Sequence, residues 1–298
     1  MLLKRQRLLL TLLEAVGGGP VRATDFQKLL FLYTREARTA SAYEFVPYKF
    51  GAFSFTAYAD KRKLIAAGLL ADDDQNWVLT DAGRAAARRQ PVEPLRAAWF
   101  CRRHARLRGD ALVVEQYRRF PWYATRSEIL DQLPLDPETR ARIEAARSRR
   151  GPAGLMTIGY EGRSLEEYLN VLLRDGVTLL CDVRRNPLSR KYGFSKGTLS
   201  AACEGVGLRY AHLPELGIPS EQRQGLCTQA DYGELFARYE RETLPREQAA
   251  LESIRGWVAA GERVALACFE RRPEQCHRYC VAAALERLGG ATFRAQHL

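Results

Sequence analysis

Four short polar segments hold most of the side chains in this sequence that could carry out chemistry. They cover residues 159–164, 182–190, 212–217 and 268–278, and each follows an apolar run. A carboxylate in such a segment can activate water or stabilise a cationic sugar transition state, and a thiol can act as a nucleophile. The candidate catalytic residues are Glu161, Asp182, Glu270 and Cys268.

Arginines and a helix start in the same segments predict an anionic ligand. Arginine holds phosphate or carboxylate through paired hydrogen bonds, and a helix that begins near Pro273 would present unpaired N–H groups to an anion. A nucleotide unit or a sugar-phosphate backbone would fit such a site. The carboxylates could instead be salt-bridge partners of these arginines, and both roles stay open. The candidate substrate-binding residues are Tyr160, Arg184, Arg185, Arg190, His212, Glu215, His277 and Arg278.

Cys268 supports a second kind of chemistry, based on a thiolate. It would end a strand beside cations and a helix N-terminus, which favour the reactive thiolate. A phosphatase-like loop needs Arg six residues after its cysteine, and position 274 is Glu, so burial of Cys268 as a small hydrophobic side chain is the alternative. Adjacent Cys276 and His277 would point in different directions on a helix, so we expect no metal site and no cofactor.

The elements that position these segments alternate between apolar strands and amphipathic helices. Continuous apolar runs predict a mostly parallel sheet covered by helices on both faces, as in Rossmann-like α/β folds. Ligands of such sheets bind outside the carboxyl ends of the strands, so we expect the four segments to meet at one rim. The predicted strands are residues 155–159, 178–183, 207–214 and 263–269, with a last strand after residue 290, and the predicted helices are residues 164–174, 196–204, 274–288 and two within 231–261.

The four segments also carry a resemblance to a known family. They read G-Y-E-G from Gly159, D-V-R-x-x-P-x-S-R from Asp182, H-x-P-x-L-G from His212 and C-x-E-x5-C-H-R from Cys268. With these motifs in this order, the chain resembles domain-of-unknown-function family 488 over residues 156–288. One departure is Ile218, where the family often continues its glycine pair. The resemblance implies a shared domain but no activity, because the name of the family assigns none.

Residues 1–95 predict a mainly helical, winged-helix-like module. An apolar stripe within residues 2–13 indicates a first helix, and the acidic turn at residues 72–74 separates two short predicted strands. The segment FVPYKFGAFSF at residues 45–55 is similar to the Panacea-type domains found beside toxin–antitoxin systems.

Residues 96–150 predict a basic helical connector, and Gly-Pro-Ala-Gly at residues 151–154 predicts a linker to the Rossmann-like catalytic domain, residues 155–298. Arginines alternate with aromatic side chains in the connector, as they do in grooves that hold phosphates and stack exposed bases. The same aromatic side chains could instead pack the connector onto its neighbours. The candidate nucleic-acid-binding residues are Arg118, Arg119, Trp122, Tyr123 and Arg126.

Length and charge agree with this organisation. A chain of 298 residues exceeds one ordinary domain. Residues 1–150 contain 27 Lys and Arg against 17 Asp and Glu, a net charge of +10, whereas residues 151–298 contain 19 against 18, a net charge of +1. A basic half joined to a near-neutral half predicts that one part binds a polyanion while the other does chemistry. We expect nucleic acid as the partner, DNA rather than RNA, with solvated arginine-rich helices as the alternative.

The sequence also predicts the compartment. It contains no apolar run of about 18 residues that would span a membrane, and its first residues continue at helical spacing without a signal-peptide cleavage site. The seven cysteines do not have the spacing of a disulfide framework, so we expect a reducing cytoplasm. The pattern does not indicate any protein partner.

Together these features predict a hydrolase that acts on nucleic acid. We expect the removal of a modified or damaged base, as in DNA repair or antiviral (phage) defence, because carboxylates and arginines would share one rim. One alternative is a DNA-binding regulator whose α/β domain senses a small anionic ligand. The other is a cysteine-based enzyme such as a sulfurtransferase.

Overall fold

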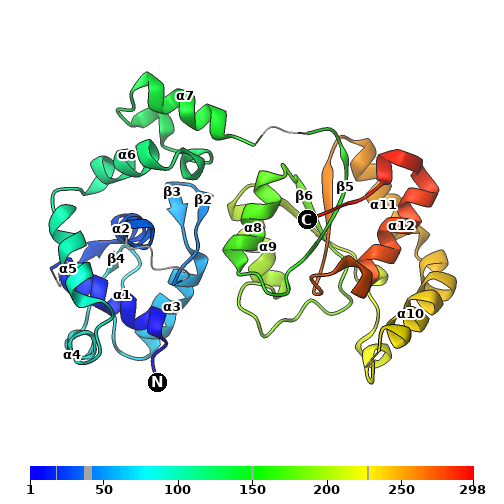
Figure 1. Ribbon diagram of the computed structural model, residues 1–298, viewed down its shortest axis with the longest axis horizontal. Helices are drawn as coiled ribbons and strands as arrows, with labels where there is room; N and C mark the ends of the chain where they lie inside the picture. Colours follow the sequence, from blue (N-terminus) through cyan, green and yellow to red (C-terminus); the bar gives the residue numbers. More distant parts are fainter. Residues whose placement is uncertain (18, 37–41, 149–150, 227) are drawn as a thin grey trace. The chain divides into compact units, whose positions relative to one another are not determined.

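The computed structural model describes residues 1–17, 19–36, 42–148, 151–226 and 228–298. The chain forms two compact units, Met1–Arg147 and Ser148–Leu298. Figure 1 shows a mainly helical first unit and a second unit built around a sheet. Among the described residues, none of the helices combines the length and apolar character that crossing a membrane requires.

A five-stranded parallel sheet forms the centre of the second unit. Its strands lie in the order β7-β6-β8-β5-β9, and every pair is parallel. The strands are β5 (Gly154–Gly159), β6 (Leu179–Asp182), β7 (Arg209–His212), β8 (Arg263–Cys268) and β9 (Gln296–His297). Because parallel pairing requires long crossover connections, helices follow the strands, and the predicted Rossmann-like α/β architecture is confirmed.

Helices cover both faces of this sheet (Figure 1), with α8 and α9 on one side and α11 and α12 on the other. They are α8 (Leu165–Arg174), α9 (Lys196–Gly205), α10 (Gln229–Arg238), α11 (Gln248–Ala259) and α12 (His277–Gly289). Ile254 of α11 and Leu285 of α12 pack with Leu266 of β8 in one buried apolar cluster. Burial on both faces explains why the strands are continuous apolar runs rather than alternating ones.

The sequence predicts the start of α8 correctly but not the start of α12. Helix α8 begins as predicted, because Ser164 accepts a hydrogen bond from the Glu167 N–H at 3.1 Å and the Glu167 carboxylate accepts one from the Ser164 N–H at 2.6 Å. The last long helix begins at His277 and not at residue 274. A 3₁₀ turn, Pro273–Gln275, comes first, and Cys276 is then extended at φ −138° and ψ 136°. This extended residue interrupts the helix that the sequence pattern predicts.

The first unit is mainly helical, with two small antiparallel sheets that pair β1 with β4 and β2 with β3. Its elements are α1 (Lys4–Ala15), β1 (Val21–Arg22), α2 (Ala23–Glu36), β2 (Val46–Tyr48), β3 (Gly51–Phe53), α3 (Phe55–Ala66), β4 (Asn76–Trp77), α4 (Asp81–Arg89), α5 (Pro94–Arg103), α6 (Gly109–Arg119) and α7 (Pro137–Ala146). The connector that the sequence predicts, residues 96–150, supplies α6, α7 and most of α5, and its described part up to Arg147 belongs to the first unit.

The buried polar side chains of the first unit include Asp60 and Lys28. Asp60 of α3 accepts hydrogen bonds from Arg5 at 2.6 Å, Gln6 at 3.0 Å and Tyr43 at 3.0 Å, so it joins α3 to α1 and to the segment before β2. Lys28 of α2 is fully buried and donates to the Ala52 carbonyl at 3.1 Å. It lines a mostly apolar cavity of about 240 Å³ between α2 and the β2–β3 hairpin. Burial lowers the pKa of Lys28 to about 7, although Asp25 opposes this.

Candidate functional site

The register of the sheet places the ends of four strands next to one another. Gly159 of β5 pairs with Cys268 of β8, and Asp182 of β6 pairs with Ala267 of β8 and His212 of β7. Each of the four polar segments therefore starts at the same carboxyl edge of the sheet, where ligands of open α/β folds bind.

Two glycines let the polar segments approach each other closely. A Cβ atom at Gly159 would lie 1.9 Å from the carbonyl oxygen of Glu270, and one at Gly217 would lie 2.0 Å from the backbone nitrogen of Arg185. Both distances are far shorter than a van der Waals contact, so a side chain at either position would push the neighbouring segment away. This packing explains the glycines that open the first motif and close the third.

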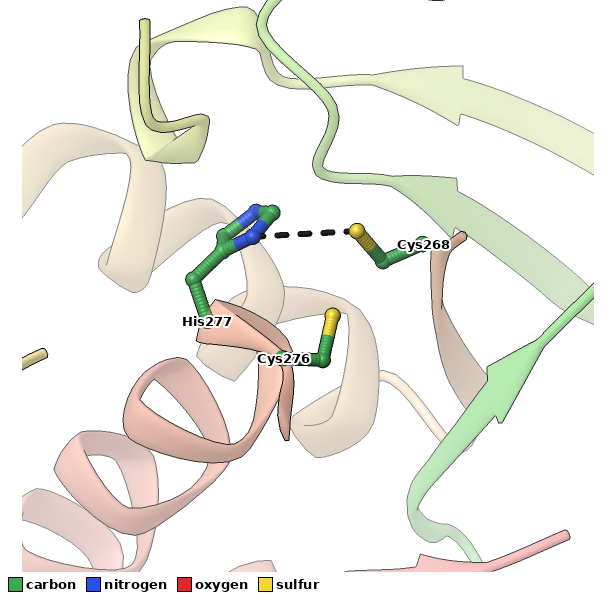
Figure 2. A group of neighbouring side chains, drawn as sticks. All are labelled: Cys268, Cys276 and His277. Atoms are coloured by element: carbon green, nitrogen blue, oxygen red, sulfur yellow. Dashed lines mark hydrogen bonds between the residues drawn. The ribbon is translucent and has the colours of Figure 1, made fainter. Parts of the chain in front are cut away.

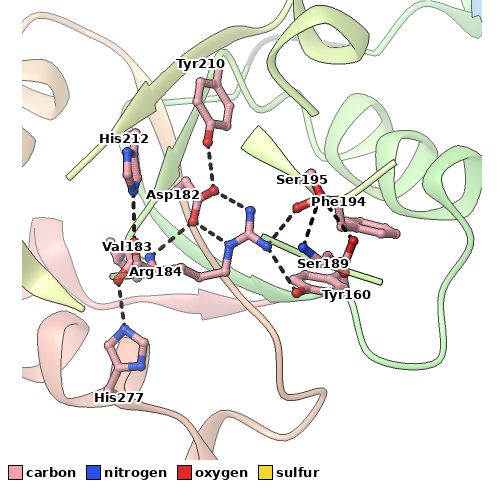
Figure 3. Close-up of polar contacts among 10 residues, drawn as sticks. All are labelled: Tyr160, Asp182, Val183, Arg184, Ser189, Phe194, Ser195, Tyr210, His212 and His277. Atoms are coloured by element: carbon pink, nitrogen blue, oxygen red, sulfur yellow. Dashed lines mark hydrogen bonds and ion pairs between the residues drawn. The ribbon is translucent and has the colours of Figure 1, made fainter. Parts of the chain in front are cut away.

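Asp182 and Arg184 form a buried ion pair at the end of β6 (Figure 3). The Arg184 guanidinium donates to Asp182 through Nε at 2.8 Å and through a terminal nitrogen at 2.5 Å. The Arg184 backbone N–H donates to the same carboxylate at 3.1 Å, and the Tyr210 hydroxyl donates to it at 2.7 Å. Both carboxylate oxygens are therefore occupied by neighbours within the unit.

The second half of the Arg184 guanidinium is also bound inside the protein. It donates to the Tyr160 hydroxyl at 3.1 Å and to the Phe194 carbonyl at 2.8 Å, and the rings of Tyr160 and Phe194 stack with centroids 4.3 Å apart. Burial lowers the pKa of Arg184, but the ion pair with Asp182 outweighs burial and raises it. Three predicted site residues, Tyr160, Asp182 and Arg184, thus form a closed network that holds the loop after β6.

Two histidines bind the backbone just beyond Asp182 (Figure 3). His212 Nε2 lies 2.9 Å from the Arg184 carbonyl, and His277 Nε2 lies 2.9 Å from the Val183 carbonyl. A carbonyl only accepts, so Nε2 carries the proton in both rings. In a neutral imidazole the other nitrogen, Nδ1, then presents a lone pair.

The lone pair of His277 faces two cysteines (Figure 2). Cys268 Sγ lies 3.7 Å from His277 Nδ1, and the ligand atoms of Cys268, Cys276 and His277 all lie within 4.8 Å of one another. The prediction that the adjacent side chains of Cys276 and His277 point in different directions is wrong. That expectation assumed helical geometry, whereas the extended backbone of Cys276 brings its sulfur to the same side as the imidazole.

These three side chains are buried, with exposed fractions of 0–2%. Burial, together with a hydrogen bond to Cys268, raises the pKa of Cys276 well above its ordinary value. Burial lowers the pKa of His277, but the contacts with Cys276 and Val183 outweigh it, and the pKa is raised. The arrangement can act as a thiol–imidazole pair or as a set of metal ligands.

Glu270 lies beside the cysteines and pairs with Arg223, which is not among the predicted site residues. Its Oε2 is 3.5 Å from Cys268 Sγ. Burial raises the pKa of Glu270, but the charge of Arg223 and a hydrogen bond with Cys276 outweigh it, so the pKa is lowered. Arg223 belongs to a short turn after the third motif, and a lone arginine there carries no pattern that would reveal its partner.

Arg278 stabilises the loop after β8. Its guanidinium, 1% exposed, donates to the carbonyl of Glu270 at 2.6 Å and to that of Arg271 at 3.1 Å. These bonds leave Arg278 inside the protein, although the sequence indicated a substrate-binding arginine.

Other predicted site residues face solvent. The Glu161 side chain is exposed, and its Oε2 accepts a hydrogen bond from the Arg271 N–H at 2.9 Å. Arg185, Arg190 and Glu215 are exposed as well, and Arg185 approaches the Pro214 carbonyl at 3.4 Å. These residues, rather than the buried network, are placed to meet a ligand.

The same loops also expose residues that are not among the predicted site residues. Tyr192 is 37% exposed and Phe269 is 42% exposed, and both lie in loops that also expose arginines. The exposed side chains of these two loops and their flanks include Arg185, Asn186, Leu188, Arg190, Tyr192, Phe269, Arg271, Arg272 and Glu274. The sequence alone does not show that Tyr192 and Phe269 are exposed next to arginines, because this depends on where the strands end and how the loops fold.

Four of the five predicted nucleic-acid-binding residues, Arg118, Arg119, Trp122 and Tyr123, contact other residues of the first unit. Arg118 pairs with Asp136 at 3.6 Å, and Arg119 pairs with Glu36. Trp122 packs against the apolar core of the unit, and Tyr123 is buried beside Phe31 and accepts a hydrogen bond from Arg35. The Arg126 side chain is exposed. The aromatic side chains thus take the packing role that the sequence left open.

Comparison with known proteins identifies a domain but no activity. Residues 164–285 match the model of the family described as "Domain of unknown function DUF488", so the second unit carries a DUF488 domain. The match covers three of the four motifs, and no family is assigned to the N-terminal region. Neither the curated proteins nor the solved structures include a match to the chain.

Proposed function

We propose that the second unit is a hydrolytic enzyme domain that removes a modified or damaged base from nucleic acid, DNA in the first place. The observation that supports this is the combination of exposed rings and exposed cations at the carboxyl edge. Phe269 and Tyr192 offer faces on which a base can stack, and Arg185, Arg190 and Arg271 offer charge for phosphates. The excess positive charge of the first unit would add affinity for the same polyanion.

Glu161 is the residue best placed to activate water. It is exposed at the edge, and the Arg271 N–H fixes one of its oxygens. In the proposed reaction Glu161 takes a proton from water while the water oxygen bonds to the sugar C1′. The bond from C1′ to the base breaks, its electron pair leaves with the base, and the base takes up the proton.

Asp182 has a different role in this proposal. Its oxygens are bound by Arg184 and Tyr210, so it holds the loop after β6 and is a positioning residue. The catalytic role is therefore assigned to Glu161 alone, because Glu270 is only 13% exposed and is paired with Arg223.

The test is release of the base from oligonucleotides that each carry one modified base, with the full-length protein. Glu161→Gln should lose on the order of 10²-fold in turnover, as expected for loss of a positioned base. Glu286→Gln is the matched control, because Glu286 is exposed in the last turn of α12, away from the edge where α12 begins. Absence of base release across the panel, or full activity of Glu161→Gln, would overturn the proposal.

A second candidate, a cysteine-based enzyme such as a sulfurtransferase, is favoured by one contact. Cys268 Sγ lies 3.7 Å from His277 Nδ1, and the Val183 carbonyl orients the ring, which is the arrangement of a thiol activated by a base. With thiosulfate as donor, the Cys268 thiolate would take the outer sulfur and release sulfite. A mass gain of one sulfur atom at Cys268, absent in Cys268→Ser, would support this candidate, and an unchanged mass would remove it.

A further inference from the structure

The cluster of Cys268, Cys276 and His277 has the dimensions of a metal site. A tetrahedral zinc ion lies about 2.3 Å from thiolate sulfur and about 2.0–2.1 Å from imidazole nitrogen, which places those two ligand atoms roughly 3.6 Å apart. Cys268 Sγ and His277 Nδ1 are 3.7 Å apart, and all three ligand atoms lie within 4.8 Å of one another (Figure 2).

The orientation of His277 fits a ligand. Metal-bound histidines commonly donate their second N–H to a backbone carbonyl or carboxylate, which fixes the ring. His277 does this through Nε2, 2.9 Å from the Val183 carbonyl, and it thereby points Nδ1 at the cysteines. The orientation is set by the backbone at the end of β6 and not by the cysteines themselves.

Glu270 lies beside these three residues and is the candidate for the fourth ligand, although its carboxylate is outside the group whose atoms all lie within 4.8 Å of one another. Its Oε2 is 3.5 Å from Cys268 Sγ, close to the separation of about 3.5–3.6 Å expected for oxygen and sulfur on one zinc ion. Zn²⁺ with two thiolates, one carboxylate and a neutral imidazole has a net charge of −1. Arg223, paired with the other oxygen of Glu270, balances that charge. A buried site needs such balance because isolated charge is costly in the interior.

We propose that Cys268, Cys276, His277 and Glu270 bind one Zn²⁺ ion in a closed site that joins the end of β8 to the start of α12. The two thiols release their protons to solvent as the metal binds. Because the three main ligands are 0–2% exposed, the ion has a structural role. It would fix the loop from Phe269 to Gln275, which carries Phe269, Arg271 and Arg272 of the proposed nucleic-acid edge.

This inference goes beyond the proposed hydrolysis, and the two can fail separately. Glu161 is not a ligand, so zinc binding can hold without base release, and base release can occur without zinc. The inference does bear on the second candidate function, because thiolates held in a closed zinc site are not free to accept sulfur.

The first measurement is the metal content of the full-length protein, expressed with added zinc and analysed by elemental mass spectrometry. We expect one zinc per chain in the wild type and none in Cys276→Ala. The control is Cys203→Ala, which removes a buried cysteine of α9 outside the cluster and should keep the zinc. Replacing the zinc by Co²⁺ should give the visible absorption of a tetrahedral thiolate site in the wild type and in Cys203→Ala, but not in Cys276→Ala.

A second measurement needs no variant, so misfolding cannot explain it. Chelation of the zinc should raise the alkylation rate of Cys268 and Cys276, read by peptide mass spectrometry, and should leave that of Cys181 unchanged. A wild type that holds no zinc and gives no cobalt absorption would overturn the proposal. Equal alkylation of Cys268 with and without chelator would also overturn it, as would equal loss of zinc in Cys203→Ala and Cys276→Ala.

Discussion

Two buried clusters lie on adjacent strands of the second unit and differ in how their polar atoms are bound. The cluster at the end of β6 is an ion pair of Asp182 and Arg184, with charged hydrogen bonds of 2.5–3.1 Å. The cluster at the end of β8 contains Cys268, Cys276 and His277, and the contacts of Cys268 Sγ are 3.5 and 3.7 Å. The polar atoms of the ion pair are bound by short hydrogen bonds, whereas Cys268 Sγ and His277 Nδ1 meet at the longer distance of 3.7 Å.

This difference indicates that the Asp182 cluster positions a loop, whereas the cluster of Cys268, Cys276 and His277 can bind a ligand. A buried carboxylate whose oxygens are occupied by arginine and tyrosine contributes to the fold and has little capacity for acid–base work. Thiols and an imidazole lone pair that converge without strong hydrogen bonds are available to a metal or an electrophile. Buried residues with the same sequence spacing from a strand end can therefore have opposite functions.

The largest expected effect is the loss of stability caused by replacing Asp182. Asp182→Asn leaves Arg184 buried without its counter-charge, and breaking such a pair costs about 3–5 kcal/mol in the free energy of unfolding. Urea denaturation would measure this against Glu286→Gln, which should be unchanged. A stable Asp182→Asn protein that has lost base release would instead return Asp182 to a catalytic role and weaken the comparison.

Sequence patterns predicted the sheet because its strands are buried on both faces and therefore read as continuous apolar runs. The carboxyl edge followed from that sheet, and so did the grouping of Glu161, Asp182, His212 and Cys268. The predictions that were wrong concern the local backbone geometry around Cys276. The extended backbone of Cys276 is not encoded in a simple pattern, so the helix was placed too early and the cysteine–histidine convergence was missed.

The sequence also could not predict which side chains pair with each other in the folded protein. Tyr210 and Arg223 are separated from Asp182 and Glu270 by 28 and 47 residues, and only the folded sheet brings them together. In the first unit, alternating arginines and aromatic side chains fit either a nucleic-acid groove or a packed helix. The burial of Tyr123 beside Phe31 depends on the tertiary packing of α2, which periodicity does not reveal.

Lys28 of the first unit is a buried cation that donates a hydrogen bond to a neutral group, the Ala52 carbonyl, whereas Arg184 is paired with the Asp182 carboxylate. The pKa of Lys28 is about 7 in the folded protein, against 10.5 in the unfolded chain. Between these values the unfolded chain binds one more proton, so stability rises with pH, by about 1.4 kcal/mol per pH unit at most. Below pH 7 both states are protonated and the cost of burying the charge is constant.

Lys28→Met should remove this pH dependence. The measurement is urea denaturation at several pH values between 7 and 10.5, followed by tryptophan fluorescence in a Trp257→Phe background, so that the first unit alone reports through Trp77, Trp99 and Trp122. The wild type should gain stability relative to Lys28→Met as the pH rises. Parallel curves for the two proteins would show that the Lys28 amine stays charged when buried.

The smallest expected effect tests a single bond of the completed cluster. Tyr210→Phe removes the hydroxyl that donates to Asp182 at 2.7 Å and keeps the ring and the Arg184 ion pair. A hydrogen bond to a charged group contributes about 1.5–3 kcal/mol, so the free energy of unfolding should fall by that amount. Tyr232→Phe is the matched control, since the ring of Tyr232 in α10 is tilted against that of Phe236, and its replacement should change stability little. If the Asp182 cluster is a scaffold, Tyr210→Phe should lower stability without changing zinc content or the rate of base release at temperatures well below unfolding. A loss of base release larger than the loss of stability explains would mean that the Tyr210 hydroxyl contacts the substrate, and the division between the two clusters would then fail at this residue.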